Sequence, residues 1–411
     1  MSPLLSAKGG TITTWSAAAD FTAVYRQALL NRAASDRSGS SETVFSDARS
    51  ALDTFTSTHA DLQRSLNSLI ENVASVAVTS QLKDLTNAFY SDLYRHFVHF
   101  RSAPLFYQLS MAFLRRACVA VKRLAIDQLG LFARHLPETT IIAIGPAGRG
   151  EYSPSCRLQI LIVHEEAAPS QLQTLTLFYH TLHDVFGAVD LPVDSDITPR
   201  NPLWAGSLED WQQRFENGLH PQADEELVHL CRLVDQYPLC SLDLTSNPLQ
   251  PFSRSALATN RTALTHLVQR MSGLSNGLGI MGRLKLERFG DERGLFRLLD
   301  HGLLPFSAAL SILALIKEST AINSCDRIRD ILKRREMDVN LAERLLTTWH
   351  TLQELRLWHE HTSQLSVQND HTLNLNPYQL TPEQQLSLKE ALESVAVIQR
   401  SVDNIFSELA S

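Results

Sequence analysis

TTIIAIGPAGRGEYSPSCRLQILIVH, residues 139–164 of the 411-residue chain, places a glycine-rich segment between two short apolar runs. The runs at 139–145 and 158–164 are rich in β-branched residues and predict two buried strands. The segment from Gly145 to Pro154 predicts a turn. Residues 171–189 then show the apolar spacing of a helix. The stretch therefore predicts a strand, a turn, a strand and a helix in that order.

The chain before this unit has a helical pattern. Residues 1–42 are weakly patterned and end in the polar run Ser35–Glu42, which predicts a flexible segment. Helices are predicted at 81–100 and 105–135. A seam of residues spaced three and four apart precedes them and consists of Leu52, Phe55, His59, Leu62, Leu66, Leu69, Val73 and Val76. The seam fits a homodimeric coiled coil or one helix of an intramolecular bundle, and its length of only about four heptads favours the bundle.

The chain after the unit is also mainly helical. Ser207, with Asp210 three residues later, predicts a helix N-cap, and Trp204 and Trp211 beside it are expected to pack in the core. An apolar stretch at 227–233 leads into residues 234–239, and the pattern from residue 253 onward is helical apart from a loop near Pro377 and Pro382.

The predicted fold class is therefore α+β and mostly helical, with a small mixed β-sheet core between two helical domains. We expect a flexible segment at 1–42, a helical domain at 43–136, the sheet domain at 137–250 and a second helical domain at 251–411.

Composition excludes several classes of protein. Hydrophobic content of 44% and charged content of 20% are globular values, and a formal net charge of −7 argues against nucleic acid as a partner. The longest apolar-rich run, Ser307–Ile316, is half of what a membrane span requires and predicts a buried helix. The N-terminus lacks the pattern of a signal peptide, and the five cysteines are scattered without C-x-x-C spacing. A cytoplasmic protein without membrane contact fits best.

The turn segment resembles the active-site hairpin of a bacterial nucleotidyltransferase-like family related to the PII uridylyltransferases and the glutamine synthetase adenylyltransferases. The hairpin of that family reads G-S-x-G-R-x-E, then six residues, then D-Q-D and an apolar strand. Gly145, Gly148, Arg149 and Glu151 match this pattern. The resemblance implies a nucleotidyltransferase-like domain in which these residues face a nucleotide.

The resemblance extends over about residues 135–405. Asp235 in the run VDQYPL matches the D-x-R-P motif of the family, and later segments follow its substrate-binding helical domain in order. Those segments are Leu284–Leu286, Cys325–Ile328, Leu355–His359 and Asn376–Leu380, and Asn201–Trp204 matches the family before Asp235. Members of the family often carry cyclic-nucleotide-binding and CBS domains upstream, where this chain has its N-terminal helical region.

The residues needed for metal-dependent transfer are largely replaced. The resemblance implies two Mg²⁺ ions held by a carboxylate pair on one strand face and by a third carboxylate on a neighbouring strand. Arg157 and Gln159 stand where the pair belongs, and Pro146 replaces the serine of the motif. Only Asp235 remains as a candidate catalytic carboxylate. Because Arg157 would also repel a cation, we expect no metal and no cofactor, although active family members would need Mg²⁺.

Two interpretations of the surviving residues stay open. Arg149 and Glu151 could form a structural ion pair, or a metal-free pocket could bind a nucleotide or another phosphorylated small molecule. The nucleotide-binding candidates are Gly145, Gly148, Arg149, Glu151, Arg157 and Gln159.

The leading hypothesis for function is a degenerate, nucleotidyltransferase-like signalling protein that binds a nucleotide or a protein partner. One alternative is an active uridylyl- or adenylyltransferase in which Asp235 helps a single ion, so whether the chain is an enzyme stays open. Another is a helical interaction or dimerisation module.

Other candidate sites carry weaker signals. Three histidine pairs lack a third ligand at recognisable spacing, so we expect no metal there: His96 and His99, His180 and His183, His359 and His361. The basic run Lys333–Arg335 predicts the solvated end of a helix. The motifs of phosphate-loop enzymes, α/β-hydrolases and H-E-x-x-H metalloproteases do not occur in the sequence.

Overall fold

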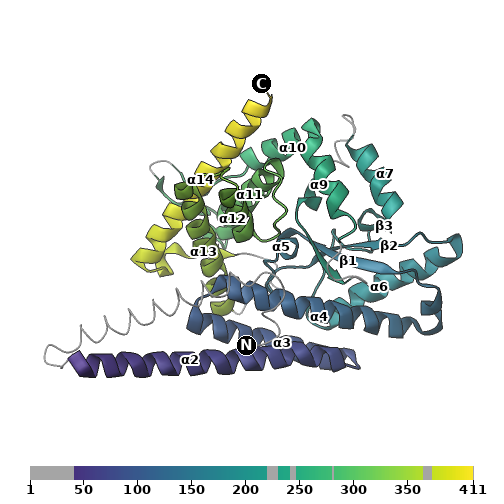
Figure 1. Cartoon of the computed structure of the whole chain (residues 1–411), viewed down its shortest axis with the longest axis horizontal. Helices are drawn as coiled ribbons and strands as arrows, with labels where there is room; N and C mark the ends of the chain where they lie inside the picture. Colours follow the sequence, from purple (N-terminus) through teal and green to yellow (C-terminus); the bar gives the residue numbers. More distant parts are fainter. Residues whose placement is uncertain (1–40, 220–229, 241–246, 280–281, 364–372, 411) are drawn as a thin grey trace.

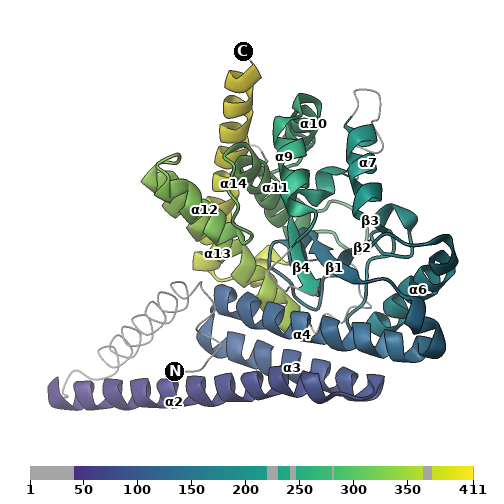
Figure 2. The same ribbon diagram turned by 45° about the vertical axis from the view of Figure 1, so that its right-hand side comes forward.

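A computed structural model describes residues 41–219, 230–240, 247–279, 282–363 and 373–410, with residues 41–56 described by their backbone only. The predicted flexible segment at 1–42 lies almost wholly outside these residues. Figures 1 and 2 show a layer of long N-terminal helices, a small sheet above it, and a cluster of C-terminal helices beside the sheet. The architecture is α+β and mostly helical, as predicted, and its central sheet is mixed.

The N-terminal layer consists of α2 (Ser41–Asn72), η2 (Val73–Ser75), α3 (Thr79–Phe100), α4 (Ala103–Leu129) and η3 (Gly130–His135). From residue 57 onward the predicted seam packs inside the chain, because Leu66 and Val73 are fully buried and Leu69 packs against the same core. This half of the seam therefore behaves as one helix of a bundle. The side chains of Leu52 and Phe55 lie outside the described residues, and homodimerisation through these helices stays a prediction.

The central sheet has the strand order β3-β2-β1-β4 within the described residues. Strands β1 (Thr139–Ile144) and β2 (Gln159–His164) are the two predicted strands, and they pair antiparallel. Strand β3 (Ala205–Ser207) runs parallel to β2, and β4 (Gln236–Cys240) pairs antiparallel with β1. Ile144 is paired with Gln159 on one side and with Gln236 on the other. The register therefore brings residues 159 and 235–236 to the turn that follows β1.

Alternate residues of the sheet enter two different cores, as expected for strands covered on both faces. Ile141 and Ile160 face the core shared with α4 and with α6 (Leu172–Ala188), which follows η4 (Pro169–Gln171). Ile142 and Leu161 face a second core that contains the two tryptophans, as predicted. Helices α7 (Leu208–Gly218) and α9 (Gln250–Thr259) and the short turns η5 (Pro202–Trp204) and η6 (Cys231–Val234) cover this face.

The predicted capping box at the start of α7 is confirmed. The Ser207 hydroxyl accepts a hydrogen bond from the Asp210 amide at 3.1 Å, and the Asp210 carboxylate accepts one from the Ser207 amide at 2.7 Å. The Trp211 indole donates to the carbonyl of Ile162 at 3.2 Å, which ties the helix to β2. Both tryptophans are therefore structural.

The C-terminal domain surrounds one apolar helix, α11 (Leu304–Ile316). Residues Leu299–Ile316 are long and apolar enough to cross a membrane, but 67% of that window is buried inside the protein, as expected for a core helix. Around α11 lie α10 (Arg261–Ser272), η8 (Leu299–Leu303), α12 (Ser324–Lys333), α13 (Val339–Thr362), η9 (Pro377–Gln379) and α14 (Pro382–Ala410).

The prediction of nearly continuous helix after residue 253 was wrong for residues 273–279 and 282–297. These residues form turns, loops and β5 (Phe296–Arg297), which pairs with β6 (Asn374–Leu375). Gly277, Gly290 and Gly294 all adopt positive φ there, a conformation that ends helices and is open to glycine.

Candidate functional site

The turn after β1 is one short helical turn, α5 (Gly145–Gly148). Both of its glycines are required by the backbone geometry. Gly145 has φ +63°. A Cβ on Gly148 would lie 2.4 Å from the backbone oxygen of Asp235, so only glycine lets the turn approach the start of β4 this closely. The amide of Glu151 donates to the carbonyl of Pro146 at 2.8 Å and closes the turn. The absence of an N–H on Pro146 costs nothing here because it stands in the first turn of the helix.

Gln159 lies directly over this turn. A Cβ on Gly145 would meet its Oε1 at 2.4 Å, so the amide side chain occupies the space in front of Gly145. Arg157 is half-buried and stands two residues before Gln159, next to the isolated bridge between Leu158 and Val193. A neutral amide and a cation therefore stand where the family resemblance implies two carboxylates.

Arg149 joins the two remaining acids of the site. Its Nε donates to Glu151 Oε2 at 3.1 Å, and its Nη1 donates to Asp235 Oδ2 at 2.8 Å. Burial alone would lower the pKa of Arg149, but the carboxylates of Asp235 and Glu151 outweigh burial and raise it. Arg149 is thus a permanent cation at the centre of the site.

The C-terminal domain holds Asp235 from its other side. Arg327 on α12 donates to Asp235 Oδ1 at 2.7 Å, and the Ser311 hydroxyl on α11 lies 2.9 and 3.0 Å from the two carboxylate oxygens. Burial by itself would raise the pKa of Asp235, but Arg327 and Arg149 lower it to about 2. Asp235 is therefore ionised near neutral pH, and both of its oxygens accept hydrogen bonds.

Glu151 is held in the same manner. Its Oε1 accepts a hydrogen bond from the indole Nε1 of Trp349 on α13 at 2.9 Å, while its Oε2 faces Arg149. The four charged groups are Arg149, Glu151, Asp235 and Arg327. Together with Ser311 and Trp349 they form a cluster that we call the clasp. Its two positive and two negative charges balance, as a buried ionic cluster requires.

The residues of the clasp do not fit the two Mg²⁺ ions of active family members. Two ions need several carboxylate oxygens that are open to them. Asp235 is the one acid of the expected three, and guanidinium groups occupy both sides of it. No group of three or more His, Cys, Asp or Glu side chains able to hold a metal occurs among the described residues.

A second polar cluster anchors the same hairpin to α13. Arg356 donates to Glu360 Oε1 at 2.8 Å, to the Ser153 hydroxyl at 2.5 Å and to the Cys156 sulfur at 2.7 Å. Tyr94 on α3 donates to Glu360 Oε2 at 2.7 Å. Arg356 and Glu360 are almost fully buried. The hairpin is thus bound to the C-terminal domain and, through Glu360, connected to the N-terminal layer.

The structure brings together most of the predicted site residues: Gly145, Gly148, Arg149, Glu151, Gln159 and Asp235 surround one turn. Sequence reasoning missed the partners from the C-terminal domain, namely Ser311, Arg327, Trp349, Arg356 and Glu360. A signal was available for Arg327, because it falls on the buried stripe of α12 with Ile328 and Ile331. An arginine in such a stripe indicates a buried anionic partner.

The other candidates have structural roles where the structure describes them. His96 is buried against His59 and Phe100, and burial lowers its pKa to about 3. His183 Nδ1 lies 2.9 Å from the Thr198 hydroxyl. Lys333 is the last residue of α12, as predicted for a helix end.

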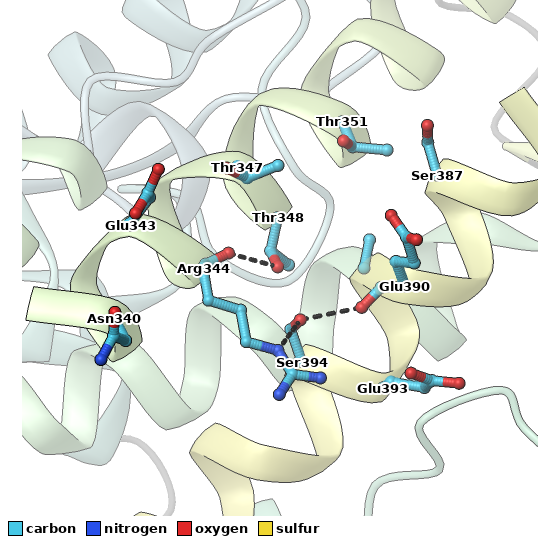
Figure 3. A pocket seen from close by; sticks show the side chains of 11 residues that line it. Asn340, Glu343, Arg344, Thr347, Thr348, Thr351, Ser387, Glu390, Glu393 and Ser394 are labelled. Carbon is cyan, nitrogen blue, oxygen red and sulfur yellow. Dashed lines mark hydrogen bonds between the residues drawn. The ribbon is translucent and has the colours of Figure 1, made fainter. Parts of the chain in front are cut away.

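A groove of about 470 Å³ lies between α13 and α14 and is lined mainly by hydroxyl and acidic side chains (Figure 3). On its floor the Arg344 Nε donates to the Ser394 hydroxyl at 2.7 Å. The groove contains none of the predicted site residues.

Comparison with known protein families gives two matches. A family model described as "Putative nucleotidyltransferase DUF294" matches residues 62–225, and one described as "Putative nucleotidyltransferase substrate binding domain" matches residues 261–406. The first match contains the hairpin, and the second contains Ser311, Arg327, Trp349 and Arg356. No curated protein matches the chain.

Proposed function

Because the chain belongs to the nucleotidyltransferase family that these two models define, with its substrate-binding domain, we propose that it is a cytoplasmic regulatory member of the family. In this proposal it binds a nucleotide or another phosphorylated small molecule, and it does not carry out metal-dependent transfer. Its output would be contact with a protein partner. One observation carries the proposal. The carboxylate oxygens of Asp235 already accept hydrogen bonds from Arg149, Arg327 and Ser311.

The charge of the site supports an anionic ligand. Arg149 is 13% exposed at the turn, and Arg157 adds a second guanidinium to the same hairpin. Guanidinium groups bind phosphate oxygens with two parallel hydrogen bonds. A Cβ built on Gly150, the residue after Arg149, would meet no atom within 4 Å, so the backbone beside this guanidinium is open. A phosphate group could approach the turn there without a metal ion.

Calorimetry on the full chain tests the proposal. We expect ATP, UTP, GTP or CTP to bind equally well with Mg²⁺ and with EDTA, and we expect no pyrophosphate release on incubation with Mg²⁺. Arg157→Gln should weaken binding about tenfold, since a hydrogen bond to a charged group contributes about 1.5–3 kcal/mol. Arg293→Gln, at an exposed loop position, is the matched control and should leave affinity unchanged. Mg²⁺-dependent binding together with pyrophosphate release would overturn the proposal in favour of an active transferase.

Restoring the carboxylate pair provides a second test. In the double variant Arg157→Asp with Gln159→Asp, the expected acids return, but Asp235 keeps its bonds to Arg327 and Ser311. We therefore expect weak Mg²⁺ binding and still no pyrophosphate release. Robust transfer by this variant would mean that the contacts of Asp235 do not prevent catalysis.

A further inference from the structure

The clasp joins the sheet domain to the C-terminal domain, and one cation, Arg149, links its two acids within the sheet domain. Asp235 and Glu151 each accept one hydrogen bond from Arg149 and another from the C-terminal domain, through Arg327 and Trp349 respectively. Arg149 is therefore the only clasp residue that bonds to both acids. Arg327 is 1% exposed and Arg149 is 13% exposed, so Arg149 is the cation that a ligand at the turn can reach.

We propose that the clasp couples the turn to the C-terminal domain, because a phosphate group bound at the turn competes with Asp235 and Glu151 for Arg149. This inference rests on the proposed function, since it needs a phosphorylated ligand at the turn. A phosphate group carries up to two negative charges and can draw the guanidinium away from the two carboxylates. Once Arg149 turns to the ligand, Asp235 and Glu151 lose the cation that they share, and their contacts to the C-terminal domain remain.

The remaining contacts make this exchange feasible. Asp235 would keep Arg327 and Ser311, and Glu151 would keep the Trp349 indole. Neither acid would be left buried without a partner, which is the arrangement that costs most. Asp235 and Arg327 would then form a pair without a competing cation, so their attraction and the hold of α11 and α12 on the start of β4 would strengthen.

A neighbouring arginine extends the coupling from Asp235 to the loop between α11 and α12. Arg254 on α9 donates to the carbonyl of Ser319, in the loop between α11 and α12, and its electrostatic neighbours are Arg327 and Asp235. Arg327 also donates to the carbonyl of Ala321 in that loop at 3.0 Å. The loop is thus held by two arginines that respond to the charge of Asp235. A change at Arg149 therefore reaches the start of α12 through contiguous contacts.

Hydrogen exchange of the full chain, followed by mass spectrometry in EDTA, tests the coupling. ATP and inorganic pyrophosphate should each lower exchange in residues 319–333 several-fold at saturation, because the Asp235–Arg327 pair becomes stronger. Adenosine, which has no phosphate, should leave it unchanged. Unchanged or faster exchange in this segment, with ATP or pyrophosphate shown by calorimetry to be bound, would overturn the proposal.

Variants separate the clasp from ligand binding. Arg327→Lys keeps the charge but loses the Nε bond to Ala321, so without ligand it should raise exchange in 319–333 several-fold. Arg329→Lys, on the same helix and paired with its neighbour Asp326 at 3.2 Å, is the matched control and should behave as wild type. Equal exchange in Arg327→Lys and wild type would refute the clasp. If ATP and pyrophosphate fail to bind, the proposed function and the coupling that rests on it fall, while this comparison still decides whether the clasp holds the domain.

Discussion

Asp235 shows at the scale of one residue how neighbours decide what a carboxylate can do. Between two guanidinium groups its ionised form is stabilised, and its oxygens are already occupied. A carboxylate in this state stabilises the fold, whereas a catalytic carboxylate must be open to a metal ion or a substrate. The family resemblance marks Asp235 as catalytic, and its hydrogen bonds indicate a structural role.

The pH dependence of stability should reveal this role. The pKa of Asp235 is about 2 in the folded protein and 3.8 in the unfolded chain, so its contribution is complete above about pH 4 and is lost as the pH falls toward 2. Asp235→Asn removes the charge and should lower the free energy of unfolding by about 2 kcal/mol or more at pH 7.

Urea unfolding of wild type and Asp235→Asn between pH 7 and pH 2.5 measures this contribution. The difference between the two proteins should shrink as the pH falls. Asp291→Asn, at an exposed position in the loop before β5, is the control and should give a small, constant difference. A difference for Asp235→Asn that stays constant down to pH 2.5 would contradict the assignment.

At the scale of elements, the turn α5 depends on how closely two strands approach it. Gly148 packs against the backbone of Asp235 and leaves no room for a side chain. The contacting atoms at the start of β4 belong to the backbone, and they cannot move aside as a flexible side chain would. The position of Asp235 relative to Arg149 is therefore set by this contact.

Gly148→Ala should lower the free energy of unfolding by about 1–3 kcal/mol, because the new methyl group would lie 2.4 Å from the Asp235 oxygen. Gly187→Ala is the matched control, since a Cβ there meets nothing within 4 Å and the residue lies near the end of α6. That change should be neutral or stabilising by up to about 1 kcal/mol. Thermal unfolding of the two variants checks the contrast, and equal losses would disprove the close approach.

At the scale of the whole molecule, the hairpin at 149–156 is the point where three parts of the chain meet. Glu151 accepts a hydrogen bond from Trp349 of the C-terminal domain, and Ser153 and Cys156 contact Arg356. The ion pair between Arg356 and Glu360 is buried, so removing one partner leaves an uncompensated charge.

Arg356→Met should therefore lower the free energy of unfolding by about 3–5 kcal/mol. Arg329→Met removes a half-exposed pair on α12 and should cost no more than about 1 kcal/mol. Chemical unfolding followed by circular dichroism measures both changes. A loss below 1 kcal/mol for Arg356→Met would show that the second polar cluster does not hold the hairpin to α13.

Local patterns in the sequence determined the strand–turn–strand unit, the helical regions on both sides, the N-cap at Ser207 and the family. These features depend on residues close together in the chain, whose periodicity and turn chemistry can be read directly. The same patterns failed at 273–279 and 282–297, where positive-φ glycines interrupt the helical pattern. The family resemblance predicted that Gln159 and Asp235 belong to one site, and in the structure both lie beside the Gly145–Gly148 turn.

Only the tertiary structure decided what Asp235 and Glu151 bind. Their partners Arg327 and Trp349 lie 92 and 198 residues away along the chain, on helices whose packing no local pattern predicts. Ion pairs and hydrogen bonds act over a few ångströms, so their partners are chosen by how the C-terminal domain packs on the sheet. That packing makes the acids part of a clasp, whereas the family motif alone marks them as a nucleotidyltransferase site.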